Sequence, residues 1–220
     1  MGINKWVLSL FTLSFLSFCL LYIYYKVGSN AKSIKILKGL PQSYNIFMVE
    51  TNSESDYLTL KQLCCIESNA LHNPNAKLNI KSMRAKINQT ILFEKYPQIE
   101  WSLMNIEEIF EETPLKDWWV QGKLTNNDKY FRYSHLSDAL RLALVYKYGG
   151  FYSDLDHIAL KNFEPLTKFS AFINGPMNVI DVESSFFHLK QHHSFFKLAM
   201  KDYALNYDGD QWVKYFFLFI

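Results

Sequence analysis

The chain has 220 residues and a formal net charge of +2 at pH 7, with 23 Lys and Arg against 21 Asp and Glu. This balance gives no reason to expect a nucleic-acid partner, because binding to phosphate backbones depends on a surplus of positive charge. Hydrophobic residues make up 49% of the chain and aromatic residues 17%, and there is no internal repeat. The composition fits a globular protein that is attached to a membrane.

The N-terminal region contains a long apolar segment. Trp6–Tyr25 is twenty residues long without a charged side chain and is bounded by Lys5 and Lys26. This length can span the apolar core of a bilayer, and aromatic residues stand near both ends, where the membrane interface would lie. We therefore expect a short tail at residues 1–5, a transmembrane anchor at 6–25 and a polar, lysine-rich stem at 26–43.

Three sequence features bear on how this segment is used. A cleaved signal peptide is the alternative to an anchor, because Gly28-Ser29 offers small residues after the apolar run. Only one lysine precedes the run and four follow it closely, so the positive-inside rule taken alone places the rest of the chain in the cytosol. Asn88-Gln89-Thr90 is an N-glycosylation acceptor and favours the lumen instead.

The remaining residues, 44–220, alternate between strand-like and helix-like segments. The first segment, Asn45–Glu50, contains the continuous apolar run IFMV, as in a strand buried on both faces. Strands that alternate with helices predict an α/β sheet, and the length is enough for one domain. The further predicted elements are a helix at Tyr57–Leu71, strands at Lys77–Met83 and Glu100–Met104, and short helices around Ile106–Phe110 and Leu115–Val120.

One stretch carries most of the information about function: SHLSDALRLALVYKYGGFYSDLD. It predicts a helix that Ser134 can cap, a break at Gly149-Gly150 where a left-handed turn can end the helix, and a short strand. The helix is apolar on almost every side, which is typical of a buried helix. Asp138 and Arg141 are nevertheless three residues apart and share one of its faces.

The short strand delivers two aspartates, Asp154 and Asp156. Residues two apart on a strand point the same way, so we expect both carboxylates on one side. Paired oxygen ligands at a strand end suit Mg²⁺ or Mn²⁺ shared with the diphosphate of a nucleotide-sugar. The second pair, Asp208-Gly209-Asp210, is expected to be a polar turn after a helix, because Asp and Gly both favour turns.

The residues alone leave two interpretations of Asp138 and Arg141. The two side chains can neutralise each other as an ion pair in the core. Alternatively, Arg141 contacts a phosphate or ribose and Asp138 accepts hydrogen bonds from sugar hydroxyls, with both facing the metal.

The pattern S-D-x-x-R, followed by G-G-x-Y-x-D-x-D, resembles the sugar-nucleotide-binding region of the D-x-D glycosyltransferases. More closely, the chain resembles the alpha-1,4-glycosyltransferase family. Three of its segments match that family in the same order: NIFMVET, LCCIESNALHNP and NIEEIFEETPLKDWW. The resemblance covers about Tyr44 to Asp210. It implies a GT-A-like, Rossmann-like α/β fold, a UDP-sugar donor, Mn²⁺ or another divalent cation, and transfer with retention of anomeric configuration.

By position, the resemblance also implies roles for individual residues. Asp138 and Arg141 would hold the donor nucleotide-sugar, Tyr152 would lie beside the base or ribose, and Asp154 with Asp156 would bind the metal and the diphosphate. An ordinary strand aromatic is the alternative for Tyr152. No catalytic nucleophile or base is assigned.

The family further implies transfer of galactose or an N-acetylhexosamine to a glycolipid acceptor in alpha-1,4 linkage. It implies a single-pass type II protein of the Golgi membrane with a luminal catalytic domain, and we follow this implication against the lysine count. The sequence ends inside the apolar run YFFLFI, so residues 44–220 are expected to be a catalytic domain truncated at the C-terminus. The alternative is a non-catalytic relative that binds UDP-sugar weakly or acts as a partner of a full-length paralogue.

Three other features receive simpler interpretations. Cys64 and Cys65 are helix neighbours that point about 100° apart, so they are not expected to bond each other; they are small buried residues, or one pairs with a cysteine beyond Ile220. His192-His193 is expected to be a surface or core pair among helical residues, not a metal site. A phosphatase of the haloacid-dehalogenase type, which also uses D-x-D, is disfavoured by the short segment before the aspartates.

Overall fold

The computed structural model describes residues 44–54, 57–84, 90–124, 131–168, 171–174 and 182–211. All of these belong to one compact unit, Leu40–Ile220. The predicted tail, anchor and stem lie outside the described residues, as do Asn88 and the C-terminal apolar run. Within the described part, no helix is long and apolar enough to cross a membrane.

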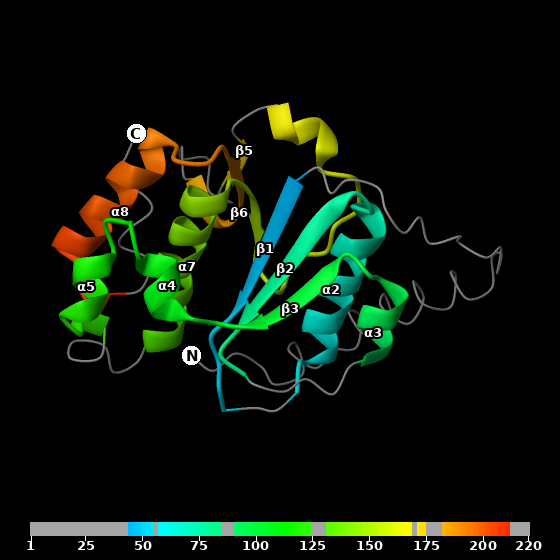
Figure 1. Cartoon of the computed structure of the whole chain (residues 1–220), viewed down its shortest axis with the longest axis horizontal. Helices are drawn as coiled ribbons and strands as arrows, with labels where there is room; N and C mark the ends of the chain where they lie inside the picture. The colour runs from blue at the N-terminus through cyan, green and yellow to red at the C-terminus, as the bar shows by residue number, and fades with distance from the viewer. Residues whose placement is uncertain are drawn as a thin grey trace, which may run out of the picture. The chain divides into compact units, whose positions relative to one another are not determined.

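The predicted α/β sheet is present and has six strands in the order β3-β2-β1-β4-β6-β5 (Figure 1). β1 pairs in parallel with β2 and β4, and β2 pairs in parallel with β3. β6 runs antiparallel to both β4 and β5. The strands are β1 Tyr44–Glu50, β2 Ala76–Ser82, β3 Ile99–Leu103, β4 Gly150–Ser153, β5 Ala171–Asn174 and β6 Val182–Leu189.

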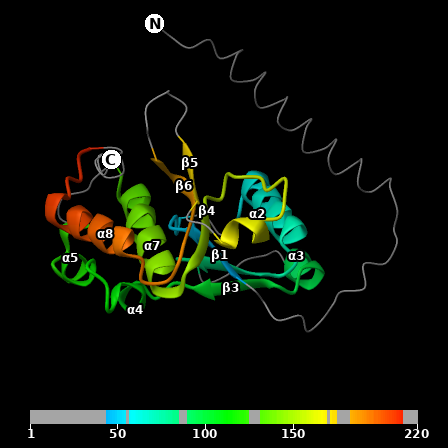
Figure 2. The same ribbon diagram turned by 90° about the horizontal axis from the view of Figure 1, so that it is seen from above.

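Helices cover both faces of this sheet (Figure 2). Alternate residues of β1 supply both cores, which explains why its sequence is continuously apolar. Ile46 and Met48 pack in a cluster with the buried residues of α2, whereas Phe47 and Val49 pack in the cluster formed by α4, α5, α7 and α8. The helices are α2 Leu60–His72, α3 Thr90–Lys95, α4 Ile106–Phe110, α5 Lys116–Val120, α7 Arg132–Tyr148 and α8 Ser194–Asn206, with a 3₁₀ turn, η1, at Glu164–Lys168.

α2 begins three residues later than the sequence pattern predicted. Thr59 is its N-cap and forms a capping box with Gln62, in which each side chain bonds the other residue's backbone N–H. The spacing of these two residues is a start signal that could have been read from the sequence. α2 also contains Cys64 and Cys65, of which Cys65 is buried, and the described residues contain no disulfide.

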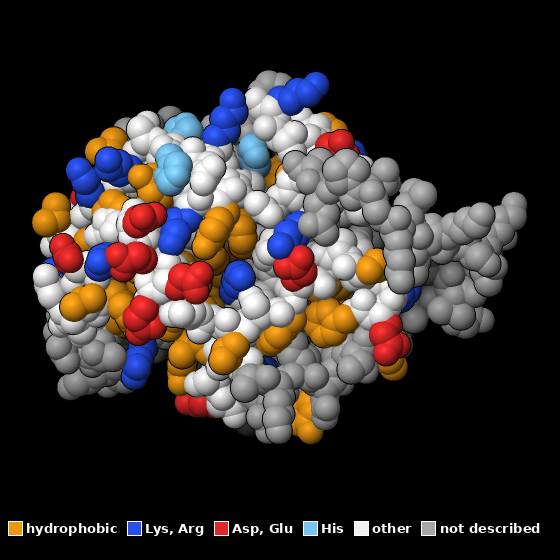
Figure 3. Space-filling model, viewed as in Figure 1, with side chains coloured by type: hydrophobic (Ala, Val, Ile, Leu, Met, Phe, Trp, Pro, Cys, Tyr) orange, Lys and Arg blue, Asp and Glu red, His pale blue; other side chains and the backbone are white. Residues whose placement is uncertain are grey.

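The short helices α4 and α5 match their prediction and are held by their apolar faces. Ile106, Ile109, Phe110 and Trp118 are buried in the core under α7. The opposite faces carry acidic side chains, which gather over these two helices in Figure 3. The exposed acidic residues in and between the two helices are Glu107, Glu108, Glu111, Glu112 and Asp117.

α7 is the buried helix predicted from its apolar sequence, but it starts earlier than expected. Its N-cap is Phe131, with no side-chain capping bond, so the predicted cap at Ser134 is wrong. Contacts with another part of the chain stabilise the extra turn, because Thr51 Oγ donates to the carbonyl of Tyr133 at 2.9 Å. The helix ends as predicted at Gly149, whose φ of 65° favours glycine.

The last described elements settle two smaller predictions. His193 is not inside a helix but caps α8, its Nδ1 accepting from Phe195 N at 3.2 Å, and His192 precedes it with a φ of 56°. Asp208 lies in a turn after α8, where its Oδ1 accepts from Asp210 N at 3.1 Å, which confirms the polar turn.

Candidate functional site

The strand order identifies the edge of the sheet at which a ligand can bind. From β1 the chain continues to β2 and β3 on one side, whereas β4 lies on the other side of β1 and leads to β6 and β5. In open α/β sheets, ligands bind beyond the carboxyl ends of the strands where the strand order changes direction in this way. Here that position lies between the ends of β1 and β4, next to Asp154.

The two aspartates of the D-x-D motif follow β4 but do not lie on it. β4 ends at Ser153, and the chain turns at Asp154, whose carbonyl accepts from His157 N at 3.2 Å. The strand alternation on which the prediction of a shared orientation rested therefore does not reach the two aspartates, and the placement of both carboxylates on one side stays a prediction. Asp154 is mostly buried with 27% of its side chain exposed, whereas Asp156 is 55% exposed and forms an ion pair with Lys61 at 3.5 Å.

Arg141 joins three of the predicted site residues, Asp138, Tyr152 and Asp154, into one cluster. Its side chain is only 8% exposed, and its guanidinium lies over the ring of Tyr152 at 4.7 Å from the centroid. It donates four hydrogen bonds, to the carbonyl and hydroxyl oxygens of Ser137 and of Ser184. Its Nη2 also forms ion pairs with Asp138 Oδ1 at 3.2 Å and Asp154 Oδ1 at 3.3 Å.

The charges of this cluster change its titration. Burial raises the pKa of Asp138, and nearby Asp154 raises it further, against the opposing effect of Arg141. Burial alone would lower the pKa of Arg141, but its neighbours Tyr152, Asp154 and Asp138 raise it overall. Arg141 therefore stays charged and is the cation that allows two carboxylates to lie so close together.

Tyr152 contacts Asp154 directly. Its hydroxyl donates to Asp154 Oδ1 at 2.6 Å, and its ring stacks on Phe187 at 5.4 Å. The side chain is fully buried, and burial raises its pKa well above the ordinary value, so the hydroxyl keeps its proton and remains a donor. In this structure Tyr152 thus orients a carboxylate and has no exposed surface with which to contact a nucleotide.

Two serines belong to the cluster although sequence reasoning gave them no role. Ser137 Oγ accepts from Arg141 Nη2 at 3.1 Å and lies 3.4 Å from the Tyr152 hydroxyl. Ser184, at the start of β6, accepts from Arg141 with both its carbonyl and its hydroxyl, at 2.8 and 2.9 Å. Ser137 stands beside Asp138 in the S-D-x-x-R pattern, which was a signal, but nothing in the sequence indicates that β6 reaches Arg141.

The segment after Asp156 is attached to α2 by a row of buried polar side chains. Ser68, Asn69 and Asn73 lie at helical spacing and are each at most 3% exposed. They bond the backbone of residues 157–163 and so fix the chain that follows the D-x-D motif. The contacts are Ala159 N to Ser68 Oγ at 3.1 Å, Asn69 Nδ2 to His157 O at 3.4 Å and Phe163 N to Asn73 Oδ1 at 2.7 Å.

Replacing Asn73 tests this attachment. Asn73→Ala removes the acceptor of two groups, Phe163 N–H and the Tyr44 hydroxyl, which donates at 2.9 Å. The part-buried Phe163 N–H loses its acceptor, and the Tyr44 hydroxyl keeps only Asn162 Oδ1 at 3.1 Å among the described residues, so the fold should be destabilised by about 1–3 kcal/mol, measured by urea unfolding. Asn206→Ala is the control, because this exposed asparagine bonds Asp202 on its own helix, at 2.7 Å. Equal effects of the two changes would contradict the attachment.

The side chains at this edge fit a divalent cation shared with phosphate. Asp154 and Asp156 offer hard oxygen ligands, and Oδ2 of Asp154 takes no part in the contacts with Tyr152 and Arg141, which both use Oδ1. Among the described residues there is no group of three or more His, Cys, Asp or Glu that could hold a metal by itself. One or two carboxylates completed by substrate phosphates are typical for Mg²⁺ and suit Mn²⁺, whereas Ca²⁺ or Zn²⁺ sites use more protein ligands.

Fold and cluster together define the class of protein: an α/β domain with two aspartates beyond the carboxyl end of β4, at the switch point of its sheet. Residues 40–173 match the family described as "Glycosyltransferase sugar-binding region containing DXD motif". The chain belongs to this family. The resemblance inferred from the sequence motifs is thereby confirmed.

Similar proteins agree with this assignment. The chain is 30% identical over 182 residues to lactosylceramide 4-alpha-galactosyltransferase of Homo sapiens, a match that covers 78% of the chain and 49% of that protein. It is 28% identical to the alpha-1,4-N-acetylglucosaminyltransferase of Homo sapiens, over 50% of the chain and 30% of that protein. The chain thus spans about half the length of the first of these relatives.

A solved structure shares the fold at low sequence identity. The structure titled "PaToxG Glycosyltransferase" superimposes with a TM-score of 0.57 at 18% identity, covering 76% of this chain and 62% of that one. At this identity the likeness concerns the fold alone. It agrees with the predicted α/β class.

Proposed function

We propose that the chain is the donor-binding part of a retaining glycosyltransferase with a GT-A-like fold, which moves galactose or an N-acetylhexosamine from a UDP-sugar to a glycolipid in alpha-1,4 linkage. The observation that carries the proposal is Asp154, held by Arg141 and Tyr152 at the switch point of the sheet. The names of the similar proteins, an alpha-galactosyltransferase and an alpha-N-acetylglucosaminyltransferase, support the choice of sugar and linkage.

Asp154 and Asp156 are proposed to bind Mn²⁺, or another divalent cation, together with the diphosphate of the donor. The cation would neutralise charge on the departing UDP. Tyr152 and Arg141 hold one oxygen of Asp154 in place, so the other oxygen is directed to the ligand without first having to be ordered. The ion pair between Lys61 and Asp156 can open when the cation binds, because both side chains are more than half exposed, and Asp156 is then available as a ligand.

Asp138 and Arg141 combine both interpretations that the sequence left open. They form the buried ion pair, and they also lie beside Asp154 in the site. With 22% of its side chain exposed, Asp138 is proposed to accept hydrogen bonds from sugar hydroxyls. Arg141 is proposed to act on the donor mainly through the two carboxylates that it orients, because it already donates four hydrogen bonds within the chain.

The proposal is tested by a donor and acceptor screen on the full 220-residue chain in detergent. UDP-galactose, UDP-N-acetylglucosamine and UDP-N-acetylgalactosamine are each offered with Mn²⁺ and a lactosyl-terminated glycolipid, and products are analysed by mass spectrometry and glycosidase digestion. We expect one UDP-sugar to be consumed in a Mn²⁺-dependent reaction. Donor binding without consumption of any sugar would favour the non-catalytic relative, and absence of UDP binding would contradict the proposal.

We further propose a Golgi location with residues 44–220 in the lumen, behind an anchor at residues 6–25. If so, Asn88 should carry a glycan in cells. Glycosidase treatment should lower the apparent mass of the expressed protein, and Asn88→Gln should remove this shift. A protein without glycan that is degraded by protease added outside sealed vesicles would instead support the cytosolic orientation given by the lysine count.

A further inference from the structure

A second buried ion pair lies at the same edge of the sheet and has no part in the cluster around Arg141. It joins Glu50, the last residue of β1, to Arg84, two residues beyond the end of β2, at 3.5 Å. The two side chains are only 6% and 7% exposed. A buried ion pair contributes little net stability, because the loss of hydration offsets the attraction, so its presence calls for another explanation.

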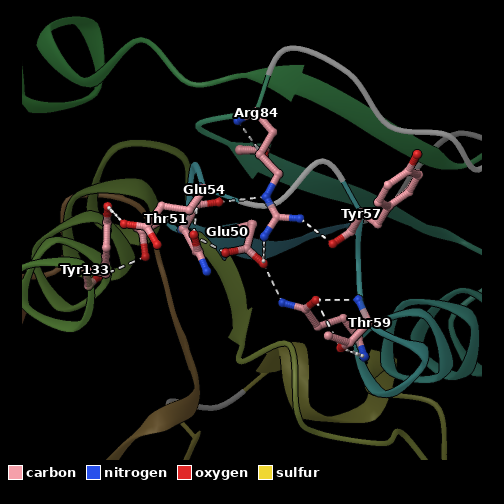
Figure 4. A network of polar contacts seen from close by, with 10 residues as sticks. Glu50, Thr51, Glu54, Tyr57, Thr59, Arg84 and Tyr133 are labelled. Carbon is pink, nitrogen blue, oxygen red and sulfur yellow. Dashed lines mark hydrogen bonds and ion pairs between the residues drawn. The ribbon is translucent and has the colours of Figure 1, made fainter.

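The contacts of Arg84 provide this explanation, since they reach both ends of the loop that joins β1 to α2 (Figure 4). Arg84 Nε donates to the carbonyl of Asn52 at 2.6 Å, and Nη1 donates to the carbonyl of Tyr57 at 2.6 Å. One planar guanidinium therefore sets the distance between the outgoing and the returning part of the loop. The backbone N–H of Arg84 donates to Ser82 Oγ at 3.0 Å, which anchors it to β2.

Glu50 holds the same loop from the side of β1. Its Oε1 accepts from Asn52 N at 2.8 Å, and its Oε2 accepts from the side chain of Gln62 in the first turn of α2. Gln62 in turn accepts from Thr59 N at 2.9 Å as part of the capping box. The pair thus links the end of β1, Asn52 and Tyr57 of the loop, and the start of α2 through hydrogen bonds.

This loop borders the switch point on the side opposite β6. On the β6 side, Arg141 lies next to Asp154 and bonds Ser184. The described loop residues between Thr51 and Leu58 instead present exposed side chains: Asn52, Ser53, Glu54 and Tyr57. If the diphosphate of a nucleotide lies at Asp154, its nucleoside therefore extends toward this loop.

We propose that Glu50 and Arg84 are positioning residues, which hold the described parts of the loop between β1 and α2, residues 51–54 and 57–59, as the nucleoside-facing wall of the donor site. The inference rests on the proposed function, because it takes Asp154 and Asp156 as the diphosphate end. Loss of the pair should therefore weaken binding of a whole nucleotide and spare binding of diphosphate alone. A role in overall stability would change both affinities alike.

The test measures two dissociation constants by calorimetry, for UDP and for inorganic pyrophosphate, each with saturating Mn²⁺ and the full chain in detergent. Arg84→Met is expected to raise the Kd for UDP about tenfold or more, because small displacements in a binding site have large effects. The Kd for pyrophosphate should stay within about twofold of the wild-type value. Hydrogen exchange at the amides of Asn52 and Thr59 should accelerate.

Ile80→Val serves as the matched control, because it lowers stability through the buried core of β2 and leaves the polar contacts of Glu50 and Arg84 in place. It should change neither the affinity ratio nor the exchange of the loop amides. Arg84→Lys is the milder variant, since an ammonium cannot hold both carbonyls with a planar fork, and it carries the test if Arg84→Met does not fold.

The outcomes separate the two proposals. Suppose that the wild-type protein binds UDP, and that the Arg84 substitutions weaken the binding of UDP and of pyrophosphate equally or weaken neither. The positioning role is then wrong and the proposed function stands. If the wild-type protein binds pyrophosphate and UDP with the same affinity, the nucleoside makes no contact and the wall is absent. If the wild-type protein binds neither with Mn²⁺, both proposals are overturned.

Discussion

Asp154→Asn is expected to weaken Mn²⁺-dependent binding of UDP by about 100-fold or more while the chain stays folded. Removal of a partner that only orients a metal ligand typically costs 10–100-fold, so loss of the ligand's own charge should cost at least as much. Asparagine keeps an acceptor for the Tyr152 hydroxyl, which now donates at 2.6 Å, so the local geometry can persist. Calorimetry with UDP, with and without Mn²⁺, measures the effect.

Asp208→Asn is the matched control for this change. Asp208 also begins an Asp-x-Asp sequence, but its Oδ1 closes a turn by accepting from Asp210 N at 3.1 Å, and an amide oxygen can do the same. The Asp208→Asn protein should therefore bind UDP with the same affinity as the wild type. Asp156→Asn should also weaken binding, and unchanged UDP affinity in both D-x-D variants would refute the proposed metal site.

The parallel part of the fold could be predicted because its sequence signals are local. β1 was recognisable from a continuous apolar run, and the buried helix α7 from apolar residues on almost every side. The helix bounds were less predictable. α2 starts at a capping box that was present in the sequence, whereas the first turn of α7 depends on a bond from Thr51, 82 positions away along the chain.

The candidate site was predictable in its members but not in its connections. Asp138, Arg141, Tyr152 and Asp154 do lie together, which their spacing on a helix and a following strand made plausible. Two facts depend on tertiary structure alone. Ser184 reaches Arg141 because β6 returns antiparallel beside β4, and the turn at Asp154 separates the environments of the two aspartates.

The Glu50–Arg84 pair shows the same limit more clearly. Nothing in the sequence relates these positions, because a residue at the end of one strand pairs with one beyond the next strand only once the parallel register is known. That register aligns Glu50 with Ser82 and so brings Arg84 close to the end of β1. Parallel neighbours are joined by long crossovers, so their contacts have no short-range signature.

Arg141→Met is expected to lower the free energy of unfolding by about 3–5 kcal/mol, which is the range for removing one partner of a buried ion pair. The change leaves Asp138 and Asp154 close together without their cation, and Ser137 and Ser184 lose the donor that they share. Urea unfolding measures the loss. Lys116→Met, which breaks an exposed pair with Glu111 at 2.6 Å, is the control and should leave the unfolding midpoint almost unchanged.

Arg141→Lys then separates stability from ligand binding. Lysine keeps the positive charge between the carboxylates but cannot reproduce the planar fork that reaches β6 and Asp154 together. We expect a smaller loss of stability than for Arg141→Met, of about 1–3 kcal/mol, and at least about tenfold weaker UDP binding by the folded protein. If folded Arg141→Lys protein binds UDP normally while its stability falls by several kcal/mol, Arg141 serves the core alone. The orientation of Asp154 would then depend on Tyr152, and Tyr152→Phe should produce the binding defect in its place.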